Sequence, residues 1–166
     1  MLREIGDTWP SFELVVALAN SFGASLTATA RKYCELAPQE CAVVWSVEGI
    51  VRWIHPASRF RHFVGMGREL SDQTIARKML NGEDVLSGMQ EVPAEAWISD
   101  FRLPQGATIW EESRTMPFYR GCLTLLWAKR DIRYRDSGEE ELLHELDPHE
   151  FTHERTVWPT KGKRRR

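Results

Sequence analysis

The sequence lacks a surplus of charge of either sign. Its 22 Lys and Arg residues against 24 Asp and Glu leave a formal net charge of −2 over 166 residues. Broad binding to nucleic acid or to a membrane surface depends on excess Lys and Arg, so this balance argues against both for the body of the protein. With 42% hydrophobic and 28% charged residues, the chain can form a packed core. Its length fits one domain, or a small helical unit joined to a larger one.

Cysteine is also scarce. The three cysteines, Cys34, Cys41 and Cys122, are odd in number and form no CxxC pair, which predicts buried, reduced thiols and a cytoplasmic protein. The N-terminus has no apolar run typical of a signal peptide. No stretch approaches the roughly 18 apolar residues that a membrane-spanning helix needs. The longest apolar run, residues 122–128, has the length of a buried strand.

Several catalytic and binding motifs are missing. The chain contains no GxGxxG, no P-loop and no GxSxG, and it shows no internal repeat. The cysteines have no local pattern of His or Asp that would indicate a nucleophile. We therefore predict no catalytic, cofactor-binding or metal-binding residue in this chain.

Two short helices joined by a tight turn are predicted near the N-terminus. Ser11 is a suitable N-cap for a helix over residues 12–21, and Gly23 is placed to end that helix in a left-handed turn. Ser25 caps a second helix over residues 26–36. Apolar residues three and four apart give each helix one inward face. The expected inward residues are Phe12, Val15, Val16, Ala19 and Phe22, then Leu26, Ala30, Tyr33 and Cys34.

After these helices the pattern becomes typical of β-strands. Residues 41–54 predict two strands around a turn at Glu48 and Gly49, because β-branched and aromatic residues lie on both sides of the turn. Ser71 would cap a helix over residues 71–84. Further strands are predicted over residues 59–66, 95–101, 107–114 and 121–130, the last being apolar enough to lie centrally. The predicted fold is α+β, with a helical pair followed by an antiparallel sheet and a flanking helix.

We divide the chain into a helical segment (1–38), a sheet domain (39–132) and a charged, flexible tail (133–166). The tail contains HEFTH at residues 149–153, which has the spacing of a zinc-peptidase motif. On a helix, His149 and His153 would share one Zn²⁺ while Glu150 activates the metal-bound water. Pro148 prevents a regular helix upstream, and no third ligand is evident, so we favour a solvated tail. A small zinc hydrolase is the first alternative.

The turn between the first two helices resembles that of a DNA-binding helix–turn–helix, with a central glycine and Ser25 opening the second helix. That helix offers only Arg31 and Lys32 as positive charges, which is a weak electrostatic footprint. We favour a packing unit and keep a DNA-binding regulator using residues 25–36 as the second alternative. The basic run at residues 161–166 could contact nucleic acid or an acidic partner, or stay solvated.

Seven tryptophans are many for a chain of this size, and filling of the core explains most of them. We also expect some strand tryptophans to line a modest pocket for a small ligand. The candidates are Trp45, Trp53, Trp97, Trp110 and Trp127.

The run SFELVVALANSFGASLTATARKYCEL, followed by CAVVWSVEGIVRW, resembles a region of the ImmA/IrrE-family zinc metallopeptidases. There, a phrase like LAxxFGVSxxATxxRyxEL leads into a hairpin with a Cys-Ala-x-Val-x-Ser type strand, just downstream of the catalytic part. Residues 111–127 resemble the closing strands of the same proteins. The resemblance covers roughly residues 1–130. It implies a helix–turn–helix-like linker and a sheet domain similar to a GAF-type sensor fold.

In that family the HExxH helix and an ANxFAxxLLMP helix precede this region, so no zinc ligand or catalytic glutamate is carried over to this chain. The resemblance implies a non-catalytic regulatory, sensor or partner-binding module. In the family, the peptidase part cleaves repressor-type regulators in stress responses. The implied partners are that peptidase portion or such a regulator, with a small ligand in the sheet domain and no membrane.

Overall fold

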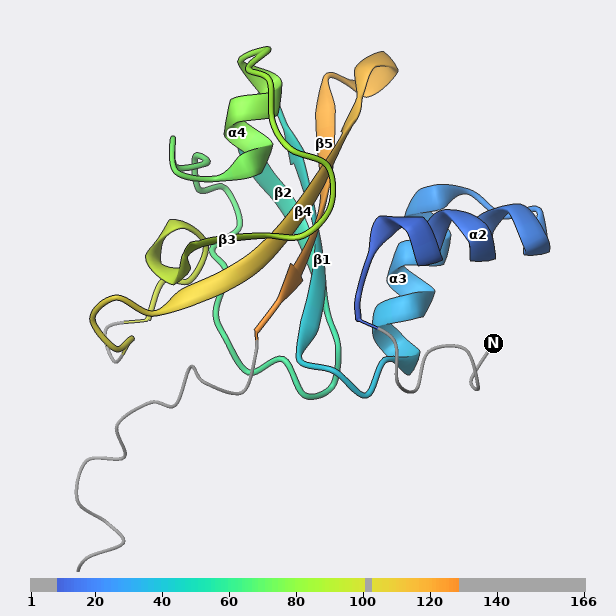
Figure 1. Cartoon of the computed structure of the whole chain (residues 1–166), viewed down its shortest axis with the longest axis horizontal. Helices are drawn as coiled ribbons and strands as arrows, with labels where there is room; N and C mark the ends of the chain where they lie inside the picture. Colours follow the sequence, from blue (N-terminus) through green and yellow to red (C-terminus); the bar gives the residue numbers. More distant parts are fainter. Residues whose placement is uncertain (1–8, 101–102, 129–166) are drawn as a thin grey trace, which may run out of the picture. The chain divides into compact units, whose positions relative to one another are not determined.

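The computed structural model describes residues 9–100 and 103–128. Two helices precede a five-stranded antiparallel sheet, and a third helix flanks the sheet, which confirms the predicted α+β class (Figure 1). The HEFTH motif and the basic run at residues 161–166 lie outside the described residues, so the zinc alternative stays a prediction.

Both N-terminal helices begin where the sequence predicts. Helix α2 (Phe12–Phe22) is capped by the Ser11 hydroxyl, which accepts a hydrogen bond from the Leu14 amide at 3.2 Å. Helix α3 (Leu26–Leu36) is capped in the same way by Ser25. The turn between them depends on Gly23, whose φ of 60° lies in the left-handed region that a side chain disfavours.

The inward face of α2 differs in part from the prediction. Leu18 is buried, whereas Val16 is only half-buried and Phe22 is exposed. Phe22 lies in the last turn, past the buried stripe formed by residues 12, 15, 18 and 19. The next position of this helical stripe would be buried only if the core extended past the last turn of α2. The core ends at Ala19, so Phe22 is left in solvent.

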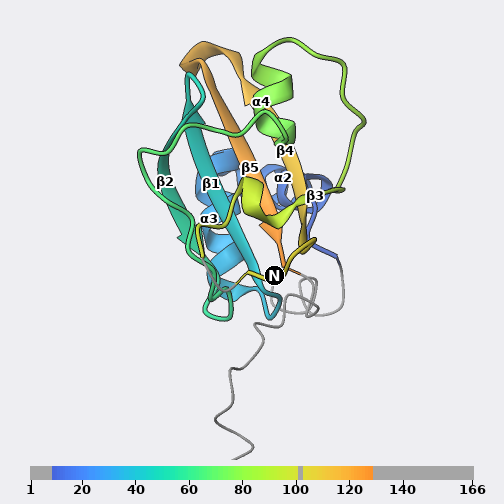
Figure 2. The ribbon, with the colours of Figure 1, turned by 90° about the vertical axis from the view of Figure 1, so that its left-hand side faces the viewer.

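The five strands form one sheet in which every neighbouring pair is antiparallel, in the order β2-β1-β5-β4-β3 (Figure 2). The strand predicted as central, β5, is central. The strands are β1 (Cys41–Val47), β2 (Ile50–Pro56), β3 (Gln90–Pro93), β4 (Thr108–Met116) and β5 (Gly121–Trp127).

The β1–β2 turn is the one predicted. Glu48 and Gly49 have φ angles of 51° and 79°. Positive φ at both central residues is the signature of a two-residue hairpin whose twist matches that of the strands. Glu48 additionally ion-pairs with Arg120 at 3.1 Å, which links this turn to the neighbouring β4–β5 turn.

Two strand predictions are wrong. Residues 59–66 form no strand, although Phe60, His62 and Val64 are buried in alternation. Alternating burial mimics a strand, but a ladder needs a free edge, and the outer edge of β2 is bonded instead by residues 67–70. In the predicted strand 95–101, the described residues form the end of a short 3₁₀ turn, η1 (Ala94–Ala96), and an irregular segment.

The third helix is shorter than predicted, and its cap is different. Helix α4 (Ile75–Leu80) begins after Thr74, whose hydroxyl accepts from the Arg77 amide and donates to the Ser71 carbonyl. Ser71 therefore starts the turn that precedes the helix, and it is not the cap. Asn81 and Gly82, with φ of 78° at the glycine, end the helix early.

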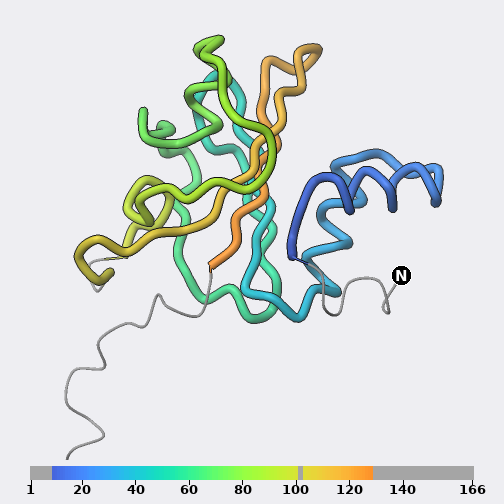
Figure 3. The backbone as a smooth tube through the Cα atoms, viewed as in Figure 1, coloured from blue at the N-terminus to red at the C-terminus, as the bar shows by residue number. Residues whose placement is uncertain are grey.

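The sheet carries a core on each face. Helix α4 lies on one side of the sheet and the α2–α3 pair on the other (Figure 1, Figure 3). The first core includes Val44, Ile109 and Leu126 from the strands, with Ile75 of α4. The second includes Val43, Leu123 and Leu125, with residues of α2 and α3.

No single helix among the described residues has the length and apolar character needed to cross a bilayer. Helices α2 and α3 meet those criteria only as a pair, across the 112° bend between them.

Candidate functional site

A fully buried carboxylate lies between α4 and the sheet. Glu111 of β4 is 0% exposed and faces the α4 side. Its Oε1 accepts hydrogen bonds from the Ala76 amide at 2.7 Å and the Ser113 hydroxyl at 2.8 Å. Its Oε2 accepts from the Trp97 indole N–H at 2.7 Å. One side chain thereby joins β4, the first turn of α4 and the segment after η1.

Burial raises the pKa of Glu111 above its ordinary value, and the hydrogen bonds from Trp97, the Ala76 and Ile75 amides and Ser113 oppose that rise. A strongly perturbed buried carboxyl is often part of a functional site. Here every oxygen is occupied by the protein itself, and no open space reaches the group. The arrangement is suited to holding α4 against the sheet rather than to acting on a substrate.

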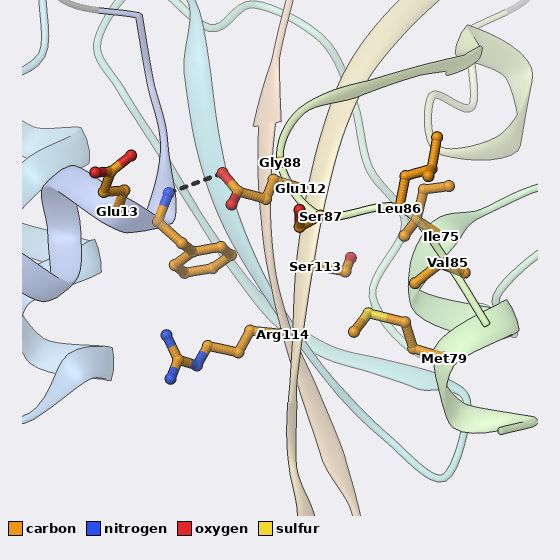
Figure 4. Close-up of a pocket in the computed structure, with 11 residues that line it drawn as sticks. Glu13, Ile75, Met79, Val85, Leu86, Ser87, Gly88, Glu112, Ser113 and Arg114 are labelled. Carbon is orange, nitrogen blue, oxygen red and sulfur yellow. Dashed lines mark hydrogen bonds between the residues drawn. The ribbon is translucent and has the colours of Figure 1, made fainter. Parts of the chain in front are cut away.

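An open groove of about 300 Å³ lies beside β4, next to this carboxylate (Figure 4). Glu112 and Arg114 lie on the side of α2, whereas Ser113 points toward α4, because successive strand residues face opposite sides. Ser87 and Gly88, from the segment between α4 and β3, form a further wall. The remaining lining residues are Phe12 and Glu13 of α2, Ile75 and Met79 of α4, and Val85 and Leu86 of the connecting segment.

The polar side of the groove carries uncompensated charge. The Glu112 carboxylate accepts a hydrogen bond from the Phe12 amide at 2.8 Å, at the first turn of α2. Burial raises the pKa of Glu112, and the neighbouring Glu13 raises it further. Neither Glu13 nor Arg114 makes an ion pair or side-chain hydrogen bond with another described residue. The charge of Arg114 lowers the pKa of Glu112 and is partly balanced by that carboxylate, whereas the charge of Glu13 is available to a bound molecule.

The five tryptophans that we expected to contribute to a pocket lie in three separate places. Trp97 is buried beside Glu111, and Trp45 stacks on Trp53 with ring centroids 6.5 Å apart on the opposite face. Trp110 and Trp127 form a separate cluster with Trp9. Of the five candidates, Trp53 lines a small hollow of about 160 Å³, and none lines the β4 groove.

The positively charged residues of α3 are already engaged within the chain. The guanidinium of Arg31 lies 5.8 Å from the centre of the Trp53 ring, and Lys32 pairs with Glu35 at 2.7 Å. This leaves α3, the helix named in the DNA-binding alternative, little free charge for phosphate contacts.

The described residues hold no group of three or more His, Cys, Asp or Glu side chains arranged to bind a metal ion. All three cysteines are free and buried, as predicted. Cys34 and Cys41 lie with their sulfur atoms 3.9 Å apart, and the hydrogen bond with Cys41, together with burial, raises the pKa of the Cys34 thiol. Neutral, enclosed thiols are poor nucleophiles and poor metal ligands.

Sequence reasoning missed both Glu111 and the groove. The pattern around Glu111 reads as an ordinary strand with acidic residues on its exposed face, and no spacing rule marks one of them as buried. The groove depends on where β3 begins relative to β4, and only the pairing register of the two strands reveals this. Comparison with known proteins found no matching family model and no matching curated protein.

Proposed function

We propose that this chain is a non-catalytic regulatory module that recognises a partner protein, and that the groove beside β4 is its binding site. The observation that carries the proposal is an open groove lined by both apolar side chains and two charged ones, Glu13 and Arg114, that form no ion pair within the described part of the chain. Sites that combine apolar walls with a few convergent polar groups are typical of binding surfaces. The observed architecture, an antiparallel sheet with α4 on one face and the α2–α3 pair on the other, is compatible with the GAF-type expectation.

The buried carboxylate of Glu111, next to the groove, supports a binding role over a catalytic one. Glu111 is enclosed and already accepts hydrogen bonds from the protein, so it is not accessible to a substrate. Glu112 is engaged in holding the start of α2. The exposed groups that remain, Glu13 and Arg114, offer charge for recognition but no nucleophile–base pair.

The proposal is tested by panning a random-peptide library against the full chain. Ser87→Trp, at an exposed wall position of the groove, places an indole in the binding space. Ser58→Trp, at an exposed serine outside the groove, is the matched control. We expect enriched peptides to bind the wild type and Ser58→Trp equally, and Ser87→Trp about tenfold more weakly or worse, as for loss of roughly 1.4 kcal/mol.

Two results would overturn the proposal. One is the enrichment of peptides that bind Ser87→Trp as tightly as the wild type, because their site would then lie elsewhere. The other is the absence of any enriched peptide.

DNA binding by α3 is a second candidate, favoured by the 112° bend between α2 and α3, since DNA-binding helix pairs cross at about 90–120°. A gel-shift experiment at low salt tests it. Loss of binding in Arg31→Ala would support a role of this helix, and no shift with any duplex would remove the candidate.

A further inference from the structure

The groove runs beside a length of β4 that has no neighbour on its outer edge. β3 begins at Gln90, opposite Glu111, whereas β4 continues beyond Glu111 to Met116. Residues 112–116 pair with β5 on their inner edge. No backbone hydrogen bond joins their outer edge to another described residue. Because alternate residues of a strand direct N–H and C=O groups to each edge, unpaired donors and acceptors face the groove.

The segment before β3 does not fill this position. If the register of β3 and β4 continued, Met89, Gly88 and Ser87 would lie opposite residues 112–114. Instead, Ser87 and Gly88 line the groove and make no backbone hydrogen bond to the strand. The groove is therefore the space that one more strand would occupy, beside β4 and in line with β3.

The two sides of this space differ in chemistry. The α4 side is mostly apolar. One of its side chains, Leu86, is 79% exposed to solvent. The α2 side carries two carboxylates against one guanidinium, which leaves it net negative. The apolar side is lined by Ile75, Met79, Val85 and Leu86, and the charged side by Glu13, Glu112 and Arg114.

We infer that the groove binds an extended segment of a partner protein by strand addition to residues 112–116, and that the segment alternates apolar and basic residues. Successive side chains of an extended chain point to opposite faces. Every second side chain of the segment would therefore meet the apolar side, and those between would meet the carboxylates. Main-chain hydrogen bonds supply affinity in this mode and the alternating side chains supply specificity. The inference rests on the proposed function and specifies its partner.

The first experiment measures the affinity of the full chain for synthetic six-residue peptides by titration calorimetry. A Leu-Lys alternating peptide is compared with a Leu-Glu alternating peptide and with a block peptide of three Leu followed by three Lys. We expect the Leu-Lys alternating peptide to bind about tenfold or more tightly than either control. Equal binding of the alternating and block peptides would overturn the inferred extended conformation.

The second experiment tests the backbone pairing directly. In an added strand, the N–H groups of alternate residues face β4 and the others face solvent. The Leu-Lys peptide is therefore N-methylated either at all leucines or at all lysines. We expect one of these two peptides to lose about tenfold or more in affinity, as for two or more lost hydrogen bonds, and the other to bind as before. Retention of affinity by both, or equal loss in both, would overturn strand addition.

The third experiment changes the charges of the groove. Glu13→Ala removes an attractive charge and is expected to weaken binding of the Leu-Lys peptide several-fold at low salt. Arg114→Ala removes a charge that repels the lysines of the peptide, and it is expected to strengthen binding of the Leu-Lys peptide. Both side chains are exposed, so neither change should disturb folding. Changes of the same sign in both variants would contradict the inferred charge preference.

These experiments separate the inference from the proposed function. Peptides selected from the random library that depend on Ser87, yet tolerate both N-methylation patterns, would overturn strand addition and leave the groove as a partner site. Selected peptides that bind Ser87→Trp as tightly as the wild type would overturn both strand addition and the proposed binding site.

Discussion

At the scale of single residues, Glu111 is a carboxyl group that the fold encloses completely. Its carboxylate connects β4 to α4 through the Ala76 amide and to the segment after η1 through the Trp97 indole. The same side chain bonds Ser113, which in turn lies 2.8 Å from Thr124 of β5. Such a network stabilises the fold only while every member has its partner.

Glu111→Gln should change how stability depends on pH. Burial raises the folded-state pKa of Glu111, so the folded state holds the proton more tightly than the unfolded state does. This contribution to stability is complete below the unfolded-state pKa and is lost as the pH rises through the folded-state pKa. We therefore expect the free energy of unfolding of the wild type, minus that of Glu111→Gln, to decrease as the pH rises above the range in which glutamate titrates in the unfolded state.

Urea unfolding at a series of pH values measures this difference. Glu112, whose pKa is also raised, is present in both proteins, so its contribution cancels. A difference that stays constant over the range would contradict the expected titration.

Gly121→Ala should be destabilising because the site has no room for a methyl group. An added Cβ would collide with the Trp45 ring and approach the Ser46 carbonyl oxygen to 2.8 Å. Overpacking of this kind costs about 1–3 kcal/mol. Gly65→Ala is the control, since its nearest neighbour would lie at 3.7 Å, and we expect a change within about 0.5 kcal/mol. Thermal unfolding compares the two, and equal melting temperatures would be inconsistent with the packing described.

At the scale of elements, helix starts were predictable where one serine precedes a run of helical period, as at Ser11 and Ser25. The start of α4 was not, because Ser71 and Thr74 are both good caps and lie one turn apart. The choice depends on Glu111, which accepts the amide of Ala76 in the first turn after Thr74. That partner comes from a distant strand, which local pattern cannot reveal.

Thr74→Ala should therefore cost more stability than Ser71→Ala. The buried Thr74 hydroxyl both caps α4 and bonds the Ser71 carbonyl, and loss of a cap costs about 0.5–2 kcal/mol. The Ser71 hydroxyl makes only a 3.3 Å contact with the Gln73 amide, so its loss should stay within about 0.5 kcal/mol. Chemical denaturation ranks the two variants, and the reverse order would show that Ser71 is the effective cap.

At the scale of the whole molecule, the two cores enclose all three thiols. Cys34, Cys41 and Cys122 are each 0% exposed, and burial raises the pKa of Cys122 to about 11. Reaction of these thiols with a water-soluble reagent therefore requires opening of the structure. The rate of their modification reports on the integrity of both faces of the sheet.

In native buffer near pH 8, we expect Ellman's reagent to modify the thiols at least about a thousandfold more slowly than in denaturant, in line with the small unfolded fraction of a stable domain. All three cysteines should react after unfolding. Absorbance at a single wavelength follows the reaction. Rapid modification of one thiol in native buffer would show that this thiol is accessible to solvent in the folded protein.

The sequence by itself determined the elements whose signals are local: the caps and period of α2 and α3, the Glu48–Gly49 turn, and the apolar run that becomes the central strand β5. These features depend on neighbours in the chain, which the sequence contains. Tertiary structure alone decided that residues 59–66 form no strand, that Glu111 is enclosed, and that β4 extends beyond β3 to leave an open edge. Each of those outcomes depends on which distant segment lies against the edge or the face of a strand. Local sequence cannot specify this, because backbone groups find their hydrogen-bond partners, and side chains their cover, among neighbours in space.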